Sequence, residues 1–273
     1  MPYLWIKFAV AFYSFALLWA LAAVSRPCTF LGKIVLPTLG IGMAFQFVSL
    51  TELVLLNGHL GLELLSVHES ESLLAFLILI VFLLVYWRYR TLSPGIFLFP
   101  LVFLLTFASA IAQQSVQFNS PLLRSGWIFV HIALIFTGYA ALFLSFGASI
   151  LYLLQERSLK SKQTGGLFAR LPALEVIDEI GYKSLLFGFP FMTFGLLAGS
   201  VLAQAQFGPM YFLDPKILLS LLMWVVYMVL LYTRWSSGWR GKRAAYLATF
   251  AFLAAVSAWA ANYFSGVHRF IQQ

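Results

Sequence analysis

Long apolar runs recur along the whole chain and constrain its fold more than any other feature. Each run is about 20 residues long, which is enough to cross the hydrocarbon core of a bilayer as a helix. Only 10% of the residues are charged, whereas a soluble domain carries roughly 25%. The sequence therefore predicts an all-α fold, a polytopic transmembrane helical bundle that forms a single transmembrane domain over residues 1–273. We expect eight spans, at residues 4–24, 34–56, 72–90, 95–113, 126–155, 181–205, 216–233 and 244–264.

Basic residues concentrate in alternate loops and predict the orientation of the bundle. Positive charge marks the cytoplasmic side of a membrane protein. One side has only Lys7, Arg124, Lys216 and Arg269. The other side has Arg26, Lys33, Arg88, Arg90, Arg157, Lys160, Lys162, Arg170, Lys183, Arg234, Arg240, Lys242 and Arg243. We therefore expect a multi-pass protein of the plasma (inner) membrane with both termini on the outer side, and we interpret the net charge of +8 as a topology signal that does not indicate nucleic acid.

The four histidines all fall on the predicted outer side. His131 stands near the start of the fifth span, and His268 follows the last span. Imidazole is a common axial ligand of heme iron and of other metals. This placement suggests a cofactor held at the outer membrane surface. The only cysteine is Cys28, so the chain has no Cys-x-x-Cys-His motif for covalent heme attachment.

The segment between the sixth and seventh spans carries a family resemblance. It runs from Gly199 to Lys216 and ends in Leu213-Asp214-Pro215-Lys216. This segment resembles the cytochrome c assembly protein family, which includes the heme-handling CcsA and CcmC proteins and the shorter HemX-like proteins. The region that resembles the family covers about residues 70–270. Seven residues agree with the family pattern, namely Gly199, Ala203, Gly208, Asp214, Pro215, Lys216 and Trp224.

The resemblance implies a heme site on the outer side. In the family, two histidines flank a tryptophan-rich segment and ligate heme, and His131 and His268 resemble them. The implied ligands of the heme iron are therefore these two residues, and the other implied cofactor-binding residues are Phe207, Tyr211, Asp214 and Trp224. The segments at residues 151–157 and 171–175 resemble the HemX-like branch. The implied function is heme binding, with an accessory role in cytochrome c-type biogenesis or heme homeostasis, and the implied partners are the bilayer, heme and other maturation proteins.

Departures from the family pattern leave a second hypothesis open. Tryptophans of the pattern are replaced by Leu202, Phe207, Tyr211 and Leu213, and Ile217 replaces a glutamate. These losses favour a non-catalytic HemX-like partner that regulates a tetrapyrrole-synthesis enzyme and retains no heme site. In either case we expect no enzyme, because the chain lacks a nucleophile elbow and a phosphate-binding glycine loop.

Local alternatives remain for three of these features. His131 and His268 suit interfacial histidines that bond to carbonyl groups as well as they suit heme ligands. Asp214 before Pro215 is typical of a helix N-cap. The outer loop with His59 and His68 is better interpreted as a solvated acidic loop than as a divalent-metal site, since its spacing matches no metal signature.

Overall fold

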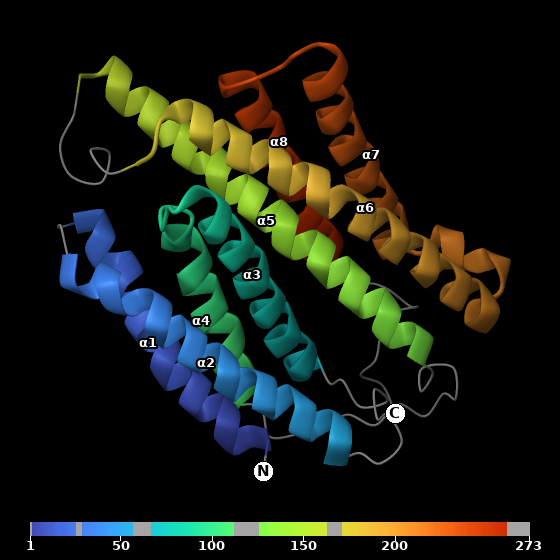
Figure 1. Cartoon of the computed structure of the whole chain (residues 1–273). Coiled ribbons are helices and arrows are strands. Elements are labelled where there is room, and N and C mark those ends of the chain that lie inside the picture. The colour runs from blue at the N-terminus through green and yellow to red at the C-terminus, as the bar shows by residue number, and fades with distance from the viewer. Residues whose placement is uncertain (1, 26–28, 57–66, 112–125, 163–170, 261–273) are drawn as a thin grey trace. The chain divides into compact units, whose positions relative to one another are not determined.

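Eight α-helices form the described part of the chain in the computed structural model (Figure 1). The structure describes residues 2–25, 29–56, 67–111, 126–162 and 171–260. This confirms the all-α prediction and the number of helices. By length and composition, all of them except α4 and α8 are candidate membrane spans. The helices are α1 (Pro2–Ser25), α2 (Thr29–Leu56), α3 (Val67–Tyr89), α4 (Gly95–Ile111), α5 (Gly126–Lys160), α6 (Leu174–Phe207), α7 (Pro215–Ser236) and α8 (Lys242–Ala260), with a short 3₁₀ helix, η3 (Pro209–Leu213), before α7.

Four helix ends lie five or more residues outside the predicted spans, among them the starts of α2 at Thr29 and of α3 at Val67. The structure continues α5 to Lys160 and starts α6 at Leu174, so the predicted ends at residues 155 and 181 are wrong. Hydropathy stops at the first charged residues, but charged residues are good helix formers. Ion pairs four residues apart also stabilise the extensions, and the structure contains the pairs Glu156–Lys160 and Glu179–Lys183, each at 2.6 Å.

The chain divides into two compact units, and the first contains α1 to α4. It comprises Met1–Gln117 with Leu154–Val176. In this unit α1 packs on α2 and α4, and α3 packs on α4 and α2. The Tyr13 hydroxyl donates to Oε1 of Gln46 at 2.7 Å, and Nε2 of Gln46 donates to the Ser72 carbonyl at 2.9 Å. Buried polar groups are costly unless they are paired, so this network joins α1, α2 and α3, and the buried Gln46 has a structural role.

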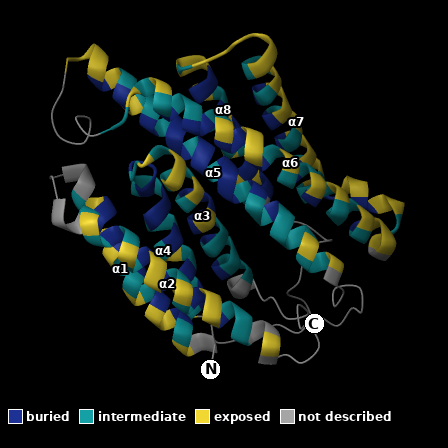
Figure 2. Ribbon diagram, in the orientation of Figure 1, coloured by how far each residue is buried: buried dark blue, intermediate teal, exposed yellow. Residues whose placement is uncertain are grey.

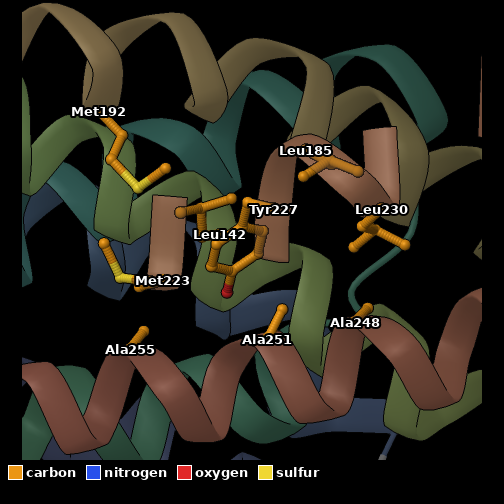
Figure 3. Close-up of a cluster of buried hydrophobic side chains, with 9 residues drawn as sticks. All are labelled: Leu142, Leu185, Met192, Met223, Tyr227, Leu230, Ala248, Ala251 and Ala255. Carbon is orange, nitrogen blue, oxygen red and sulfur yellow. The ribbon is translucent and has the colours of Figure 1, made fainter. Parts of the chain in front are cut away.

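The second unit comprises Phe118–Leu153 with Ile177–Gln273. In Figure 2, buried positions lie along α5, whereas α7 shows mainly intermediate and exposed positions in this view. Figure 3 shows the unit's central cluster, in which α8 contributes only alanines while α7 contributes larger side chains. Because alanine adds little bulk, the backbone of α8 approaches these side chains closely. The cluster consists of Leu142, Leu185, Met192, Met223, Tyr227, Leu230, Ala248, Ala251 and Ala255.

Helices α5 and α6 approach each other through glycines. A Cβ atom added at Gly188 would lie 2.8 Å from the Cβ of Ala141 and 3.0 Å from the carbonyl oxygen of Gly138. At Gly181, two turns earlier on α6, the nearest atom would be the Cβ of Ala148 at an ordinary 3.5 Å. Small residues allow membrane helices to pack at short backbone distances. The seam therefore requires a glycine at 188 and tolerates a methyl group at 181.

A buried ion pair joins α6, α7 and the start of α8. Nη2 of Arg234 donates to Oδ2 of Asp178 at 2.7 Å, and the two side chains are only 8% and 16% exposed. The other carboxylate oxygen, Oδ1, accepts the backbone N–H of Gly241 at 3.2 Å. The guanidinium carbon lies 4.9 Å from the ring centroid of Tyr182. The carboxylate of Asp178 on α6 thus binds both the end of α7 and the start of α8.

The glycine seam can be tested by substituting one methyl group at each of two positions. Gly188→Ala should lower the free energy of unfolding by about 1–3 kcal/mol, because overpacking forces the two backbones apart. Gly181→Ala should leave it unchanged or raise it by up to about 1 kcal/mol through better helix propensity. Thermal unfolding in detergent, followed by tryptophan fluorescence, measures both variants. Equal melting temperatures for the two variants would contradict this account of the seam.

The buried ion pair between α6 and α7 can be tested against a half-exposed pair within α6. Arg234→Met should cost about 3–5 kcal/mol, because it leaves the carboxylate of Asp178 buried without a countercharge. Lys183→Met breaks the half-exposed pair with Glu179 and should cost no more than about 1 kcal/mol. The same unfolding measurement compares them. A small loss in both variants would mean that water reaches Asp178.

Candidate functional site

His131 lies in the second turn of α5, and its ring contacts α6. Nδ1 of His131 is 2.7 Å from the carbonyl oxygen of Gly195. A carbonyl oxygen only accepts hydrogen bonds, so Nδ1 carries the proton and the lone pair of the neutral ring is on Nε2. No hydrogen bond from Nε2 is found within the described part of the chain. This is the tautomer in which histidine ligates a metal through Nε2, with the other nitrogen held by a backbone carbonyl.

The absence of a side chain at Gly199 allows this ring position. A Cβ atom at residue 199 would overlap Cε1 of the His131 ring and would lie 2.7 Å from Nδ1. Gly195 and Gly199 are one turn apart, so both lie on the face of α6 that meets α5. The carbonyl contact agrees with the interfacial interpretation of His131. It also leaves the second ring nitrogen available to a ligand.

The segment after α6 forms a turn that ends in a capped helix. Gly208, at φ +68°, ends α6, and Pro209 begins η3. Oδ1 of Asp214 accepts the backbone N–H of Lys216 at 2.9 Å, and Asp214 is buried. The N-cap interpretation of Asp214 is therefore confirmed. The cap fixes the start of α7 and the segment that precedes it.

Exposed apolar side chains cover η3. Met210, Phe212 and Leu213 are 71%, 56% and 67% exposed, and Phe207 at the end of α6 is also exposed. Tyr211 is only 4% exposed, with its ring centroid 4.1 Å from that of Phe212. The family resemblance implied Phe207 and Tyr211 as cofactor-binding residues and did not point to Met210 or Phe212. The tight 3₁₀ turn, with three residues per turn, places Met210 and Leu213 on one face and turns Tyr211 inward.

Trp224, which the resemblance implied as a cofactor-binding residue, lies well inside α7. It is nine residues beyond Pro215, or about 14 Å along α7. Its indole N–H donates to Oγ1 of Thr193 at 2.9 Å, and its ring stacks on Phe189 at 5.7 Å between centroids. Thr193 is two residues before Gly195 and so points to a nearly opposite side of α6. In this structure Trp224 packs α7 on α6.

Lys216 lies in the first turn of α7, two residues after the Asp214 cap. The bond from His131 to Gly195 joins the start of α5 to α6 within the second unit. His268 and His59 lie outside the described residues, so ligation by two histidines stays a prediction. His68 is in α3. In the described ranges, no group of three or more histidine, cysteine, aspartate or glutamate side chains is placed to hold a metal ion.

Fold and site together define a polytopic helical membrane protein with one oriented imidazole on α5 and an exposed apolar turn after α6. The family model described as "Cytochrome C assembly protein" matches residues 64–265. The chain belongs to the cytochrome c assembly protein family.

Similar proteins include several named "Cytochrome c biogenesis protein CcsA". The protein of Heterosigma akashiwo (strain NIES-293 / 8280G21-1) is 30% identical over 222 residues, which cover 68% of this chain and 69% of the relative. That of Guillardia theta is 30% identical over 204 residues, 67% of this chain and 68% of the relative. That of Chlamydomonas reinhardtii is 30% identical over 244 residues, 85% of this chain and 67% of the relative. Membership of the HemX-like branch stays a prediction.

Proposed function

We propose that this chain is a heme-binding integral membrane protein with a non-catalytic, accessory role in cytochrome c-type biogenesis. The heme site would lie on the outer side of the plasma membrane, with His131 as one iron ligand and His268 as the other. The names of the relatives support the role in cytochrome c biogenesis. The observation that carries the heme site is the 2.7 Å hydrogen bond between Nδ1 of His131 and the carbonyl of Gly195.

The ligand set favours an iron porphyrin over a bare metal ion. A structural or catalytic metal ion usually needs three or four protein ligands, and the described residues offer no such group. Heme brings four nitrogen ligands of its own, so one or two axial side chains are enough. A single oriented imidazole is therefore chemically suited to heme.

The turn after α6 and the start of α7 offer the two kinds of group that bind a porphyrin, apolar side chains and a cation. Exposed Phe207, Met210 and Phe212 offer apolar surface for the macrocycle. The ammonium group of Lys216 offers a positive charge for a propionate. Bound heme would supply an iron centre. The protein would orient the imidazole of His131 toward the iron and exclude water from one side of the heme.

Absorption spectra test the heme site directly. Purified protein, reduced and oxidised, should show a Soret band and, when reduced, sharp α and β bands. The double variant His131→Ala, His268→Ala should lose these bands because both axial ligands are gone. The matched double variant His59→Ala, His68→Ala removes the other two histidines and should keep them.

A spectrum of the unsubstituted protein without these bands, and without binding of added hemin, would refute heme binding. It would favour the second hypothesis, a HemX-like partner of a tetrapyrrole-synthesis enzyme without a heme site. Loss of the bands in both double variants would show that the histidines act together on folding and that His131 and His268 are not specific ligands.

The hydrogen bond to Gly195 predicts an effect of Gly199→Ala on hemin affinity. The new methyl group displaces the His131 ring, which can move, so the melting temperature should change little. Loss of the groups that orient a metal ligand typically weakens metal binding about 10- to 100-fold. We therefore expect Gly199→Ala to weaken hemin binding at least about tenfold in a titration. Gly181→Ala, on the same helix, should bind hemin as the unsubstituted protein does. Unchanged affinity in Gly199→Ala would refute the positioning role and leave the heme site itself standing.

A further inference from the structure

The connection between α7 and α8, residues 235–243, is a basic and aromatic surface that the heme proposal does not use. We refer to it as the α7–α8 link. Trp235 is 82% exposed, and Trp239 is also exposed. The link has no acidic residue. Its exposed cations are Arg240, Lys242 and Arg243.

The backbone of the link has a defined conformation. The N–H group of Trp239 donates to the carbonyl of Thr233 at 3.2 Å, which extends the last turn of α7. The N–H group of Gly241 donates to Oδ1 of Asp178 at 3.2 Å. Gly241 has φ +66°, and a Cβ atom there would lie 2.6 Å from the Tyr152 hydroxyl. The exposed side chains therefore project from a backbone that the interior of the second unit fixes.

Within the described ranges of the chain, no carboxylate pairs with the cations of the link. Asp178, the carboxylate in contact with it, is already paired with Arg234. Among the residues that the structure describes, Arg240, Lys242 and Arg243 form no ion pair; the Lys242 ammonium lies 5.6 Å from the centroid of the Tyr246 ring. Lys160 and Lys183 differ, because each is paired with a glutamate at 2.6 Å.

The link continues an apolar surface of α7 that is suited to lipid. Val225, Val229, Tyr232 and Trp235 are all exposed and follow one another at intervals of three or four residues, so they lie along one face of the helix. Tryptophan and tyrosine favour the membrane interface, where one end of the ring is apolar and the other is hydrated. The cations follow directly after this row. An acidic soluble protein would match the charge, but it would not match the apolar row and its aromatic end.

We propose that the α7–α8 link is a binding site for the headgroup of an anionic phospholipid. Arg240, Lys242 and Arg243 bind the phosphate groups, and Trp235 and Trp239 lie beside the glycerol and upper acyl chain. Clusters of cations next to a membrane helix attract anionic lipids by this mechanism. The proposal is independent of the heme site.

Lipid titration by native mass spectrometry tests the proposal on the 273-residue chain in detergent. The probes are phosphatidylglycerol and phosphatidylcholine with the same acyl chains. The double variant Arg240→Gln, Arg243→Gln should bind phosphatidylglycerol about 30-fold more weakly, from the typical contribution of two cations near an anionic surface. Its binding of phosphatidylcholine should not change. The matched control Lys160→Gln, Lys183→Gln removes the same charge from paired lysines and should change phosphatidylglycerol binding less than about twofold.

Three outcomes would overturn the proposal. Equal losses in both double variants would show that net charge alone attracts the lipid. Equal affinity of the unsubstituted protein for the two lipids would show that the link does not select an anionic headgroup. Equal competition by glycerol 3-phosphate would show that the link binds free phosphate esters and has no use for the acyl chain. Hemin titration of the same variants measures heme binding independently of lipid binding.

Discussion

The short distance between the backbones of α5 and α6 is the constraint on which the second unit depends. Gly188 brings the helices together where Ala141 faces it, and Gly199 leaves space for the ring of His131. The central cluster of α5 to α8 packs against this pair. A wider spacing would move His131 away from the carbonyl of Gly195 and would also loosen the cluster. The stability of the unit and the orientation of the imidazole therefore have the same physical origin.

Several buried polar side chains in each unit are hydrogen-bonded to partners within the protein. Gln46 bonds to Tyr13 and Ser72, and Trp224 bonds to Thr193. In an apolar environment such bonds avoid the cost of an unpaired donor or acceptor. The pairings argue against an ion pathway at Gln46, since its amide is occupied by the protein. The partly exposed His131 differs because one of its nitrogens is bonded and the other is available.

Apolar run length predicted the eight helices, because crossing a bilayer demands about 20 apolar residues whatever the partners. The Asp214 cap was also predictable, since a cap is a local interaction between neighbours in sequence. The extended C-terminal end of α5 and N-terminal end of α6 were not predicted, because charged residues lower the hydropathy without ending the helix. The burial of Tyr211 depends on a 3₁₀ turn, and the depth of Trp224 on its contact with Thr193 on another helix. The sequence named His131 but had no signal for its tautomer, which depends on a carbonyl 64 residues away.

The carbonyl of Gly195 belongs to helix α6, so its oxygen accepts a second hydrogen bond. In an α-helix the same oxygen accepts the N–H of the residue four positions later, here Gly199. The imidazole therefore shares its acceptor with a turn of α6. If that turn bends, the shared oxygen moves, and the bond to Nδ1 lengthens or tightens with it. Since a stronger bond at Nδ1 makes Nε2 a better electron donor, the curvature of one helix adjusts the basicity of a ring that belongs to another.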